Sequence, residues 1–376
     1  MSVLEQAEVL VVGPAPPLRG GIAAHTRGLV EYLRATGTEA AAASWSRLYP
    51  SLAFPGRSER GSGARPSWCD ERLSIASPRT WTSLGHLLAA SRATVIVQWW
   101  HPVSAPALLA ATRRVAPERL VAVCHNVLPH EPVPLAAEAA RRLLGRCGVV
   151  LCHSSAEAEV ASRLLAPKAC RVVSAPLPCL IPAESVACAA ASRKSARIFL
   201  VPGHQRPYKN IAGVERAWSA ARRPPEARLV IAGESYLKGT KRREVEKLAA
   251  DDRSIILQDQ YLDDNSLMSI LASAEALVAW HRTSSQSGFL PLAAALGLPA
   301  IVSDAGGLPE QARALPDSDV VPAGDEAALA TVFEARLAIP ADRDEAARTA
   351  ALRQLPVRIA RSWQLVVEAI GEPLRR

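Results

Sequence analysis

The sequence predicts an α/β protein built from two parallel-sheet halves. Short apolar runs of strand type alternate with runs of helical periodicity along all 376 residues, which is typical of parallel sheets joined by crossover helices. The pattern restarts after a proline-led, small-residue segment at positions 176–195. The chain is also longer than one core usually serves, and its 49% apolar residues suffice for two cores.

The first half begins with a strand and an amphipathic helix. Val9–Val12 is a short apolar run, and Ile22, Thr26, Leu29 and Leu33 recur at helical spacing after it. The other strands predicted for this half are Glu39–Ser44, Thr94–Trp99, Leu120–His125, Val149–His153 and Arg171–Ser174.

The second half repeats this alternation. Its predicted strands are Ile198–Val201, Arg228–Ala232, Ile255–Leu257, Ala276–Trp280, Ala300–Val302 and Asp319–Val321. Its predicted helices are Ile211–Ala221, Lys241–Ala250, Asp264–Ala274 and Gly288–Leu296. Proline is favoured in the first turn of a helix, so we expect Pro356 to open a final helix that ends near Ile370.

These elements predict four parts of the chain. Residues 1–180 form a Rossmann-like domain and 181–196 a linker. Residues 197–355 form a second Rossmann-like domain, and 356–376 form a C-terminal helix.

Composition narrows the class of protein. The seven cysteines are odd in number and form no C-x-x-C pair, which favours a reduced, cytoplasmic protein without a metal site. No apolar run approaches the roughly 20 residues of a transmembrane helix. The net charge of +8 is compatible with solvated faces, phosphate-bearing substrates or peripheral contact at the inner face of a membrane. Basic residues do not alternate with aromatics in a nucleic-acid-reading motif, so we expect no nucleic-acid partner.

A turn at Ser284–Gly288 is the most informative segment. Its small polar residues lead into an apolar helical run, and a helix that begins with free backbone N–H groups can bind an anion. A second glycine turn, Asp304–Gly307, follows the next strand and lets backbone approach the same ligand. Both turns follow strands, where open α/β sheets bind ligands.

Two further segments carry candidate anion ligands. Gly20 and Gly21 stand where the first helix begins, although most strand–helix glycines only make turns. Arg206 and Lys209 follow the strand that opens the second half. Two fixed cations there can neutralise the charge that grows on a departing diphosphate, whereas the ordinary alternative is a surface charge pair.

A third cluster follows the predicted strand Leu120–His125. His125, Asn126, His130 and Glu131 lie within seven residues at its end, and an apolar strand that stops on polar residues is a site candidate. Trp99 and Trp100 end the preceding strand. Their rings could stack on a sugar or lie against lipid, but core packing explains each of them equally well.

Taken together and in order, these segments resemble the retaining GT-B glycosyltransferases of the GT4 family. The segments are RGGIAAHTRGLVEYL at 19–33, CHNVLPHE at 124–131, HSSAEAEVASRLL at 153–165, GHQRPYKN at 203–210, LVIAGE at 229–234, SQSGFLPLAAALGLPAIVSDAGGLPE at 285–310 and VVPAGDEAALA at 320–330. They span nearly the whole chain, and the specificity lies in their order.

The resemblance implies two Rossmann-like domains facing each other across a cleft, with the last helix crossing back to the first domain. The second domain would hold a nucleotide-sugar donor and the first an acceptor. It assigns catalytic roles to His125, Arg206 and Lys209. It places Gly20, Gly21, Tyr261, Gln286, Ser287, Gly288 and Glu310 on the donor side, and His25, Trp99, Trp100, Asn126 and Glu131 on the acceptor side.

The chain departs from the family at two positions. Many relatives carry two glutamates eight positions apart, which contact the sugar and the ribose, and here those positions are Ser284 and Leu292. A subgroup with the SQSG-type turn also lacks them. His204 stands where relatives often have arginine, and Arg206 is a candidate substitute.

The predicted activity is metal-independent transfer of a sugar, with retained anomeric configuration, from a nucleotide diphosphate sugar to a hydroxyl. UDP is the expected base. The acceptor is a lipid-linked or cell-envelope glycan, or a secondary metabolite. Two alternatives remain open: a nucleotide-sugar epimerase on the same fold, and a non-catalytic partner protein that binds nucleotide sugar. The missing glutamates motivate the last of these.

Overall fold

The computed structural model describes residues 2–48, 58–61, 63–129, 132–166, 170–181, 197–315, 317–340 and 345–374. Residues 182–196, nearly all of the predicted linker, lie outside these ranges. The chain forms two compact units. Unit 1 comprises Met1–Leu180 and Ala360–Arg376, and unit 2 comprises Ile181–Ile359.

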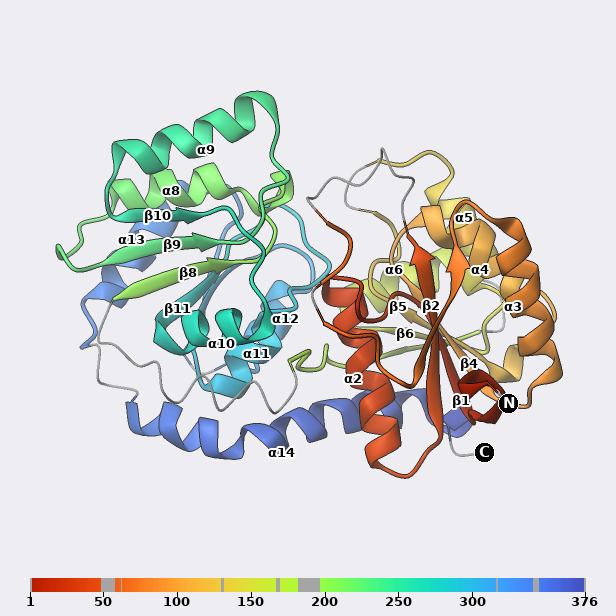
Figure 1. Cartoon of the computed structure of the whole chain (residues 1–376). Coiled ribbons are helices and arrows are strands. Elements are labelled where there is room, and N and C mark those ends of the chain that lie inside the picture. The colour runs from red at the N-terminus through yellow and green to blue at the C-terminus, as the bar shows by residue number, and fades with distance from the viewer. Residues whose placement is uncertain are drawn as a thin grey trace. The chain divides into compact units, whose positions relative to one another are not determined.

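Unit 1 is built on a seven-stranded parallel sheet in the order β3-β2-β1-β4-β5-β6-β7 (Figure 1). The strands are β1 Val9–Val12, β2 Ala40–Arg47, β3 Cys69–Ser74, β4 Thr94–Trp99, β5 Leu120–Cys124, β6 Val149–Cys152 and β7 Arg171–Ser174. The edge strand β3 is not among the predicted strands. Only Cys69 and Leu73 of it are buried, so its sequence lacks the apolar run of a central strand.

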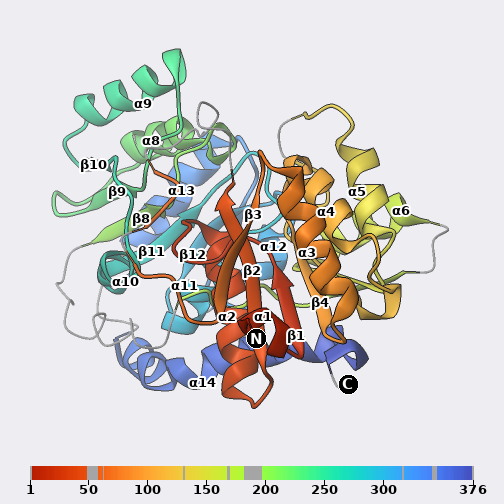
Figure 2. The same cartoon turned by 45° about the vertical axis from the view of Figure 1, so that its right-hand side comes forward.

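The helices of unit 1 cover the sheet. They are α1 Val3–Gln6, α2 Gly21–Ala35, α3 Pro78–Ala90, α4 Ala105–Thr112, α5 Ala136–Leu144 and α6 Ser155–Leu165, with 3₁₀ turns η1 Pro102–Ser104, η2 Pro117–Arg119 and η5 Glu372–Leu374. Helices α3 and α4 pack side by side (Figure 2).

Unit 2 contains a six-stranded parallel sheet in the order β10-β9-β8-β11-β12-β13. The strands are β8 Ile198–Pro202, β9 Arg228–Ala232, β10 Ile255–Gln258, β11 Ala274–Ala279, β12 Ala300–Ser303 and β13 Asp319–Val321. The sequence predicts each of them to within a few residues. Their continuous apolar runs reflect burial on both faces of the sheet.

Helices cover both faces of the second sheet. They are α8 Ile211–Ala220, α9 Gly239–Asp251, α10 Asp264–Ser273, α11 Leu290–Leu296, α12 Leu308–Ala312 and α13 Glu326–Leu337, with the 3₁₀ turn η4 Pro207–Lys209. Helices α8, α9 and α13 pack together on one face, and α11 packs with α12 (Figure 1).

The last helix, α14, spans Glu345–Ile370 and contains Pro356 within it. The prediction that Pro356 opens this helix is wrong. Proline removes one backbone hydrogen bond, but the turns before it are anchored in unit 2: the Arg348 guanidinium donates to the carbonyls of Ala274 and Glu275 at 2.8 and 2.6 Å. From Ala360 onward the helix belongs to unit 1, where Trp363 packs against Gly28.

Each sheet reverses its strand order once, between β1 and β4 in unit 1 and between β8 and β11 in unit 2. Ligands of open α/β sheets bind beyond the carboxyl ends of the strands at such switch points. The fold therefore directs attention to the segments that follow these four strands.

Candidate functional site

The switch point of unit 2 lies between the segment after β8, residues 203–210, and the segment after β11, residues 280–289. Gly203 lets these two segments pack closely. It has a φ of +83°, and a Cβ placed on it would lie 2.5 Å from Cε2 of Phe289. Only glycine fits both this backbone conformation and the close approach of the ring.

Lys209 is the buried cation of this site. Its side chain is 7% exposed, its Nζ donates to the Pro202 carbonyl at 2.8 Å, and the same Nζ lies 5.6 Å from the centre of the Phe289 ring. Burial, and secondarily the positive charge of Arg206, lower the pKa of Lys209 to about 7. An incoming anion would therefore find a group poised to take up a proton.

The Ser287–Gly288 turn is held by a side chain that the sequence analysis misses. The Gln311 side-chain amide bonds both backbone polar groups of Ser287. Its Oε1 accepts from the Ser287 N–H at 2.8 Å, and its Nε2 donates to the Ser287 carbonyl at 3.1 Å. The Ser287 N–H is thus bonded to Gln311 in this structure, and its role in holding the donor phosphate stays a prediction. Within the described part of the chain, the Gly288 N–H has no acceptor, so it is the amide left for a ligand.

The second glycine turn serves a different purpose from the predicted one. Gly306 has a φ of +55°, and a Cβ there would overlap the Ser284 carbonyl oxygen. Its lack of a side chain therefore lets the Asp304–Gly307 loop pack on the turn after β11 rather than approach a ligand. Ser284 and Leu292, at the positions of the missing glutamates, are both buried.

Arg206 lies beside Lys209 but has other contacts. Its guanidinium carbon is 4.5 Å from the centre of the Tyr236 ring, and the His204 ring stacks on Tyr236 with centroids 4.7 Å apart. Arg206 also lines a pocket between α8 and α9. Lys209 thus lies close to Phe289, the residue after Gly288, whereas the Arg206 guanidinium packs against the Tyr236 ring.

The remaining predicted donor-side residues of unit 2 are spread around this edge. Tyr261 is 37% exposed in the segment between β10 and α10. Glu310 is in the first turn of α12 and Gln286 precedes Ser287.

At the switch point of unit 1, three histidines and a glutamine form one buried chain of hydrogen bonds. His125 Nε2 is 2.6 Å from Gln98 Oε1, Gln98 Nε2 is 3.3 Å from His25 Nδ1, and His25 Nε2 is 3.1 Å from His153 Nε2. The chain ends where His153 Nδ1 meets the Ala175 carbonyl at 3.2 Å. Gln98 is the hub of this chain, and Gly13 leaves the space that its side chain fills.

One set of neutral histidine tautomers satisfies all four hydrogen bonds of the chain. The tautomers are assigned from the hydrogen-bond partners. His125 donates from Nε2 to Gln98, which donates to His25. His25 donates from Nε2 to His153, which donates from Nδ1 to the carbonyl. Burial lowers the pKa of all three rings, that of His153 to about 4. The edge of unit 1 therefore carries polar groups but no histidine charge at neutral pH.

Several side chains predicted on the acceptor side are buried in unit 1. His25 is fully buried inside the chain, and Trp99 and Trp100 are 0% and 9% exposed, so none of them presents an open face. Trp99 belongs to the core and donates to the Val127 carbonyl at 3.3 Å. Asn126 is half-buried. Glu131 and His130 lie outside the described residues.

Gly20 and Gly21 match their predicted placement at a helix start. Gly20 precedes α2 with a φ of +107°, and nothing lies within 4 Å of a Cβ built on either glycine. The backbone there is open to approach by a ligand.

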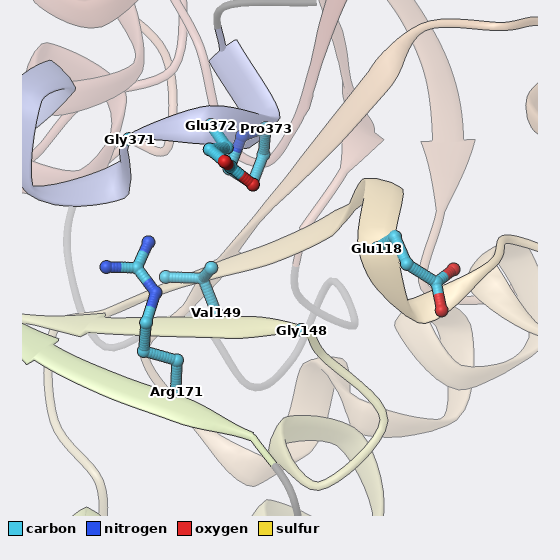
Figure 3. A pocket seen from close by; sticks show the side chains of 7 residues that line it. All are labelled: Glu118, Gly148, Val149, Arg171, Gly371, Glu372 and Pro373. Carbon is cyan, nitrogen blue, oxygen red and sulfur yellow. The ribbon is translucent and has the colours of Figure 1, made fainter.

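A pocket of unit 1 lies at the opposite edge of its sheet. It encloses about 600 Å³ between the amino ends of β6 and β7 and the Gly371–Pro373 turn. Figure 3 shows Arg171 directed toward that turn and Glu118 on the other side. Arg171 donates to the carbonyls of Ala369 and Ile370. Because ligands bind at carboxyl ends, this pocket is not the candidate site.

The described residues contain neither a metal-ligand cluster nor a membrane-spanning helix. Among the described residues, no group of three His, Cys, Asp or Glu side chains is arranged to hold a metal ion. Every helix in the described ranges is too short or too polar to span a bilayer.

Three comparisons place the chain among known proteins. Residues 196–338 match the family model described as glycosyl transferases group 1. No curated protein sequence matches the chain. Many solved structures do, among them a sucrose-phosphate synthase from Thermosynechococcus elongatus at 18% identity and a TM-score of 0.66, covering 98% of this chain and 97% of that one.

Two further structures are similar. A trehalose-6-phosphate structure from E. coli bound with UDP-2-fluoro glucose has 13% identity and a TM-score of 0.67, covering 96% of this chain and 99% of that one. An alpha,alpha-trehalose-phosphate synthase (UDP-forming) from Burkholderia xenovorans in complex with glucose-6-phosphate has 12% identity and a TM-score of 0.66, covering 98% and 100%. The predicted GT-B fold is confirmed, and the match of residues 196–338 to the glycosyl transferases group 1 model lies within unit 2.

Proposed function

We propose that this protein is a retaining, metal-independent glycosyltransferase. In this proposal unit 2 binds the diphosphate of a nucleotide sugar and unit 1 binds the acceptor hydroxyl. The observation that carries it is the position of Lys209 beside Phe289 at the switch point, where the preceding residue, Gly288, has an N–H with no acceptor among the described residues. A buried cation and an open amide at the carboxyl edge of a sheet suit a diphosphate.

The chemistry follows from charge. Departure of the nucleoside diphosphate places negative charge on the phosphate oxygens, and a protonated Lys209 with the Gly288 N–H stabilises that charge as it forms. Arg206 adds a second positive charge nearby. In retention by front-face return, the acceptor proton passes to the leaving phosphate oxygen. The acceptor oxygen bonds to the anomeric carbon on the face that the diphosphate leaves.

The neutral histidine chain of unit 1 suits a positioning role. A neutral imidazole held by Gln98 can orient a hydroxyl through a hydrogen bond without adding charge. In this proposal His125 positions a sugar hydroxyl and is not a nucleophile.

The nucleotide of the donor is proposed to be UDP. The similar structures bound with UDP-2-fluoro glucose or described as UDP-forming support this choice. The acceptor remains in the class of hydroxyl-bearing glycans, lipids or small molecules, with peripheral membrane contact part of the proposal.

A thermal-shift panel of UDP-, GDP- and dTDP-sugars tests the donor assignment. We expect the sugars of one nucleotide to raise the melting temperature of the wild type but not that of Lys209→Ala. Lys247→Ala, which changes an exposed lysine paired with Asp251, is the control and should respond as the wild type does. Equal shifts in all three proteins would refute the site. Binding without transfer to any acceptor in a broad screen would instead support the non-catalytic alternative.

A further inference from the structure

A small pocket of unit 2 shares only Arg206 with the proposed donor site. It encloses about 190 Å³ between the start of α8, the first turns of α9 and the segment after β11. Arg206, Arg216, Lys241 and Arg282 line it, with Glu244 as the carboxylate among its lining residues. Four cations converge on one cavity.

Most of this positive charge is unneutralised. Arg216 pairs with Glu326 at 2.6 Å and with Glu244 at 2.5 Å. Within the described ranges, Arg206 and Lys241 have no hydrogen-bond acceptor. Arg282 uses its Nε on Asn210 Oδ1 at 3.0 Å and leaves its terminal nitrogens open. Three sets of N–H donors are therefore available at this cavity.

The start of α8 adds to this field. Asn210 adopts a left-handed conformation just before the helix, and Ile211 and Ala212, its first residues, line the pocket. The N–H groups of a first helical turn lack intrahelical acceptors and carry partial positive charge. The backbone therefore complements the side-chain cations.

A buried carboxyl on the same helix face does not offset this charge. Glu215 is 0% exposed, and neither of its carboxyl oxygens has a partner in the described part of the chain. At 100° per residue it falls between Ile211 and Ala212 around the helix. Burial, followed by the negative charge of Glu244, raises the pKa of Glu215 to about 8, so it is largely uncharged at neutral pH.

We propose that this pocket binds a phosphate group, as inorganic phosphate or a phosphomonoester, at a site separate from the diphosphate site of Lys209 and Gly288. Guanidinium and ammonium groups together with helix N–H groups are the donors that phosphate oxygens prefer. The volume is roughly that of six water molecules, which admits a phosphate but not a nucleotide. The proposal does not depend on the identity of the sugar donor.

The test is calorimetric titration of inorganic phosphate and of methyl phosphate into the full chain. We expect saturable binding by the wild type. Binding should weaken by at least about tenfold in Lys241→Gln/Arg282→Gln, which removes two charged donors. It should be unchanged in Lys247→Gln, a matched change on the same helix outside the pocket, and in Lys209→Ala. Lys241→Gln alone, on an exposed position, covers the case in which the double variant does not fold.

The outcomes separate this proposal from the function proposed above. Tighter binding of methyl phosphate identifies a phosphomonoester ligand, and tighter binding of inorganic phosphate identifies the free ion. Absence of saturable binding up to about 10 mM, a Kd weaker than any specific site would need, overturns the proposal. So does equal loss in Lys209→Ala, because the anion would then occupy the diphosphate site.

Discussion

The switch points of the two units treat polar groups in opposite ways. In unit 1, His25, Gln98, His125 and His153 satisfy one another in a buried chain that carries no charge at neutral pH. In unit 2, Lys209 and Arg206 leave positive charge at the equivalent edge of the sheet. This difference supports the proposal that unit 2 binds a diphosphate and unit 1 an uncharged hydroxyl.

The largest expected effect comes from removing the buried cation. Lys209→Met should lower turnover by about 10²–10³, because a charge-stabilising contact at the leaving diphosphate is lost. Steady-state kinetics with the donor chosen by the thermal-shift panel measures it, with Lys247→Met as the control. Near-normal turnover in Lys209→Met would remove the contrast between the two edges.

The histidine chain can be broken at its hub. Gln98→Leu leaves His125 Nε2 and His25 Nδ1 without their partners, and each buried unpaired group costs about 1–3 kcal/mol. Urea unfolding monitored in unit 1 should report this loss. Gln364→Leu, which changes a surface glutamine paired with Glu368, should leave stability nearly unchanged. Equal stability of the two variants would show that the chain contributes nothing.

Acid should destabilise unit 1. The folded pKa of His153 is about 4 against 6.5 in the unfolded chain, so the unfolded state binds more protons below pH 6.5. Stability is present above pH 6.5 and is lost as the pH falls toward 4, by up to about 3 kcal/mol for His153. Unfolding free energies measured from pH 7.5 to 4.5 test this. A flat profile would mean that the rings take up protons in the folded protein at the same pH as in the unfolded chain.

The smallest effect concerns the turn after β11. Gln311→Ala removes the two hydrogen bonds that hold the Ser287 peptide group, and should raise the KM for the donor about fivefold, on the order of 1 kcal/mol. Little change in melting temperature is expected, since Gln311 is half-buried. A normal KM would show that the turn needs no support from α12.

Sequence reasoning predicts the fold well because every central strand is a continuous apolar run. It fails for β3, an edge strand with three consecutive charged residues, and for Pro356, which tertiary anchoring keeps inside α14. It selects Lys209, Gly288 and His125 as site candidates because they follow buried strands.

Sequence reasoning does not predict contacts between residues that are distant in the sequence. Gln98 lies within an apolar strand and Gln311 acts on a residue 24 positions earlier, so neither has a local signal. His153 ends a predicted strand as His125 does, and that shared placement is the signal that could have found it. Trp99 and Trp100 resemble site aromatics, but burial makes them core residues.

We propose that Lys209 receives the donor diphosphate, and uptake of a proton when the donor binds follows from that role. With a pKa of about 7, Lys209 is mostly neutral at pH 8 and becomes protonated when an anion binds beside it. Calorimetry of the selected nucleotide sugar at pH 8, in buffers of different ionisation enthalpy, should show uptake approaching one proton in the wild type and none in Lys209→Met. Binding of equal strength without proton uptake in both proteins would contradict the account.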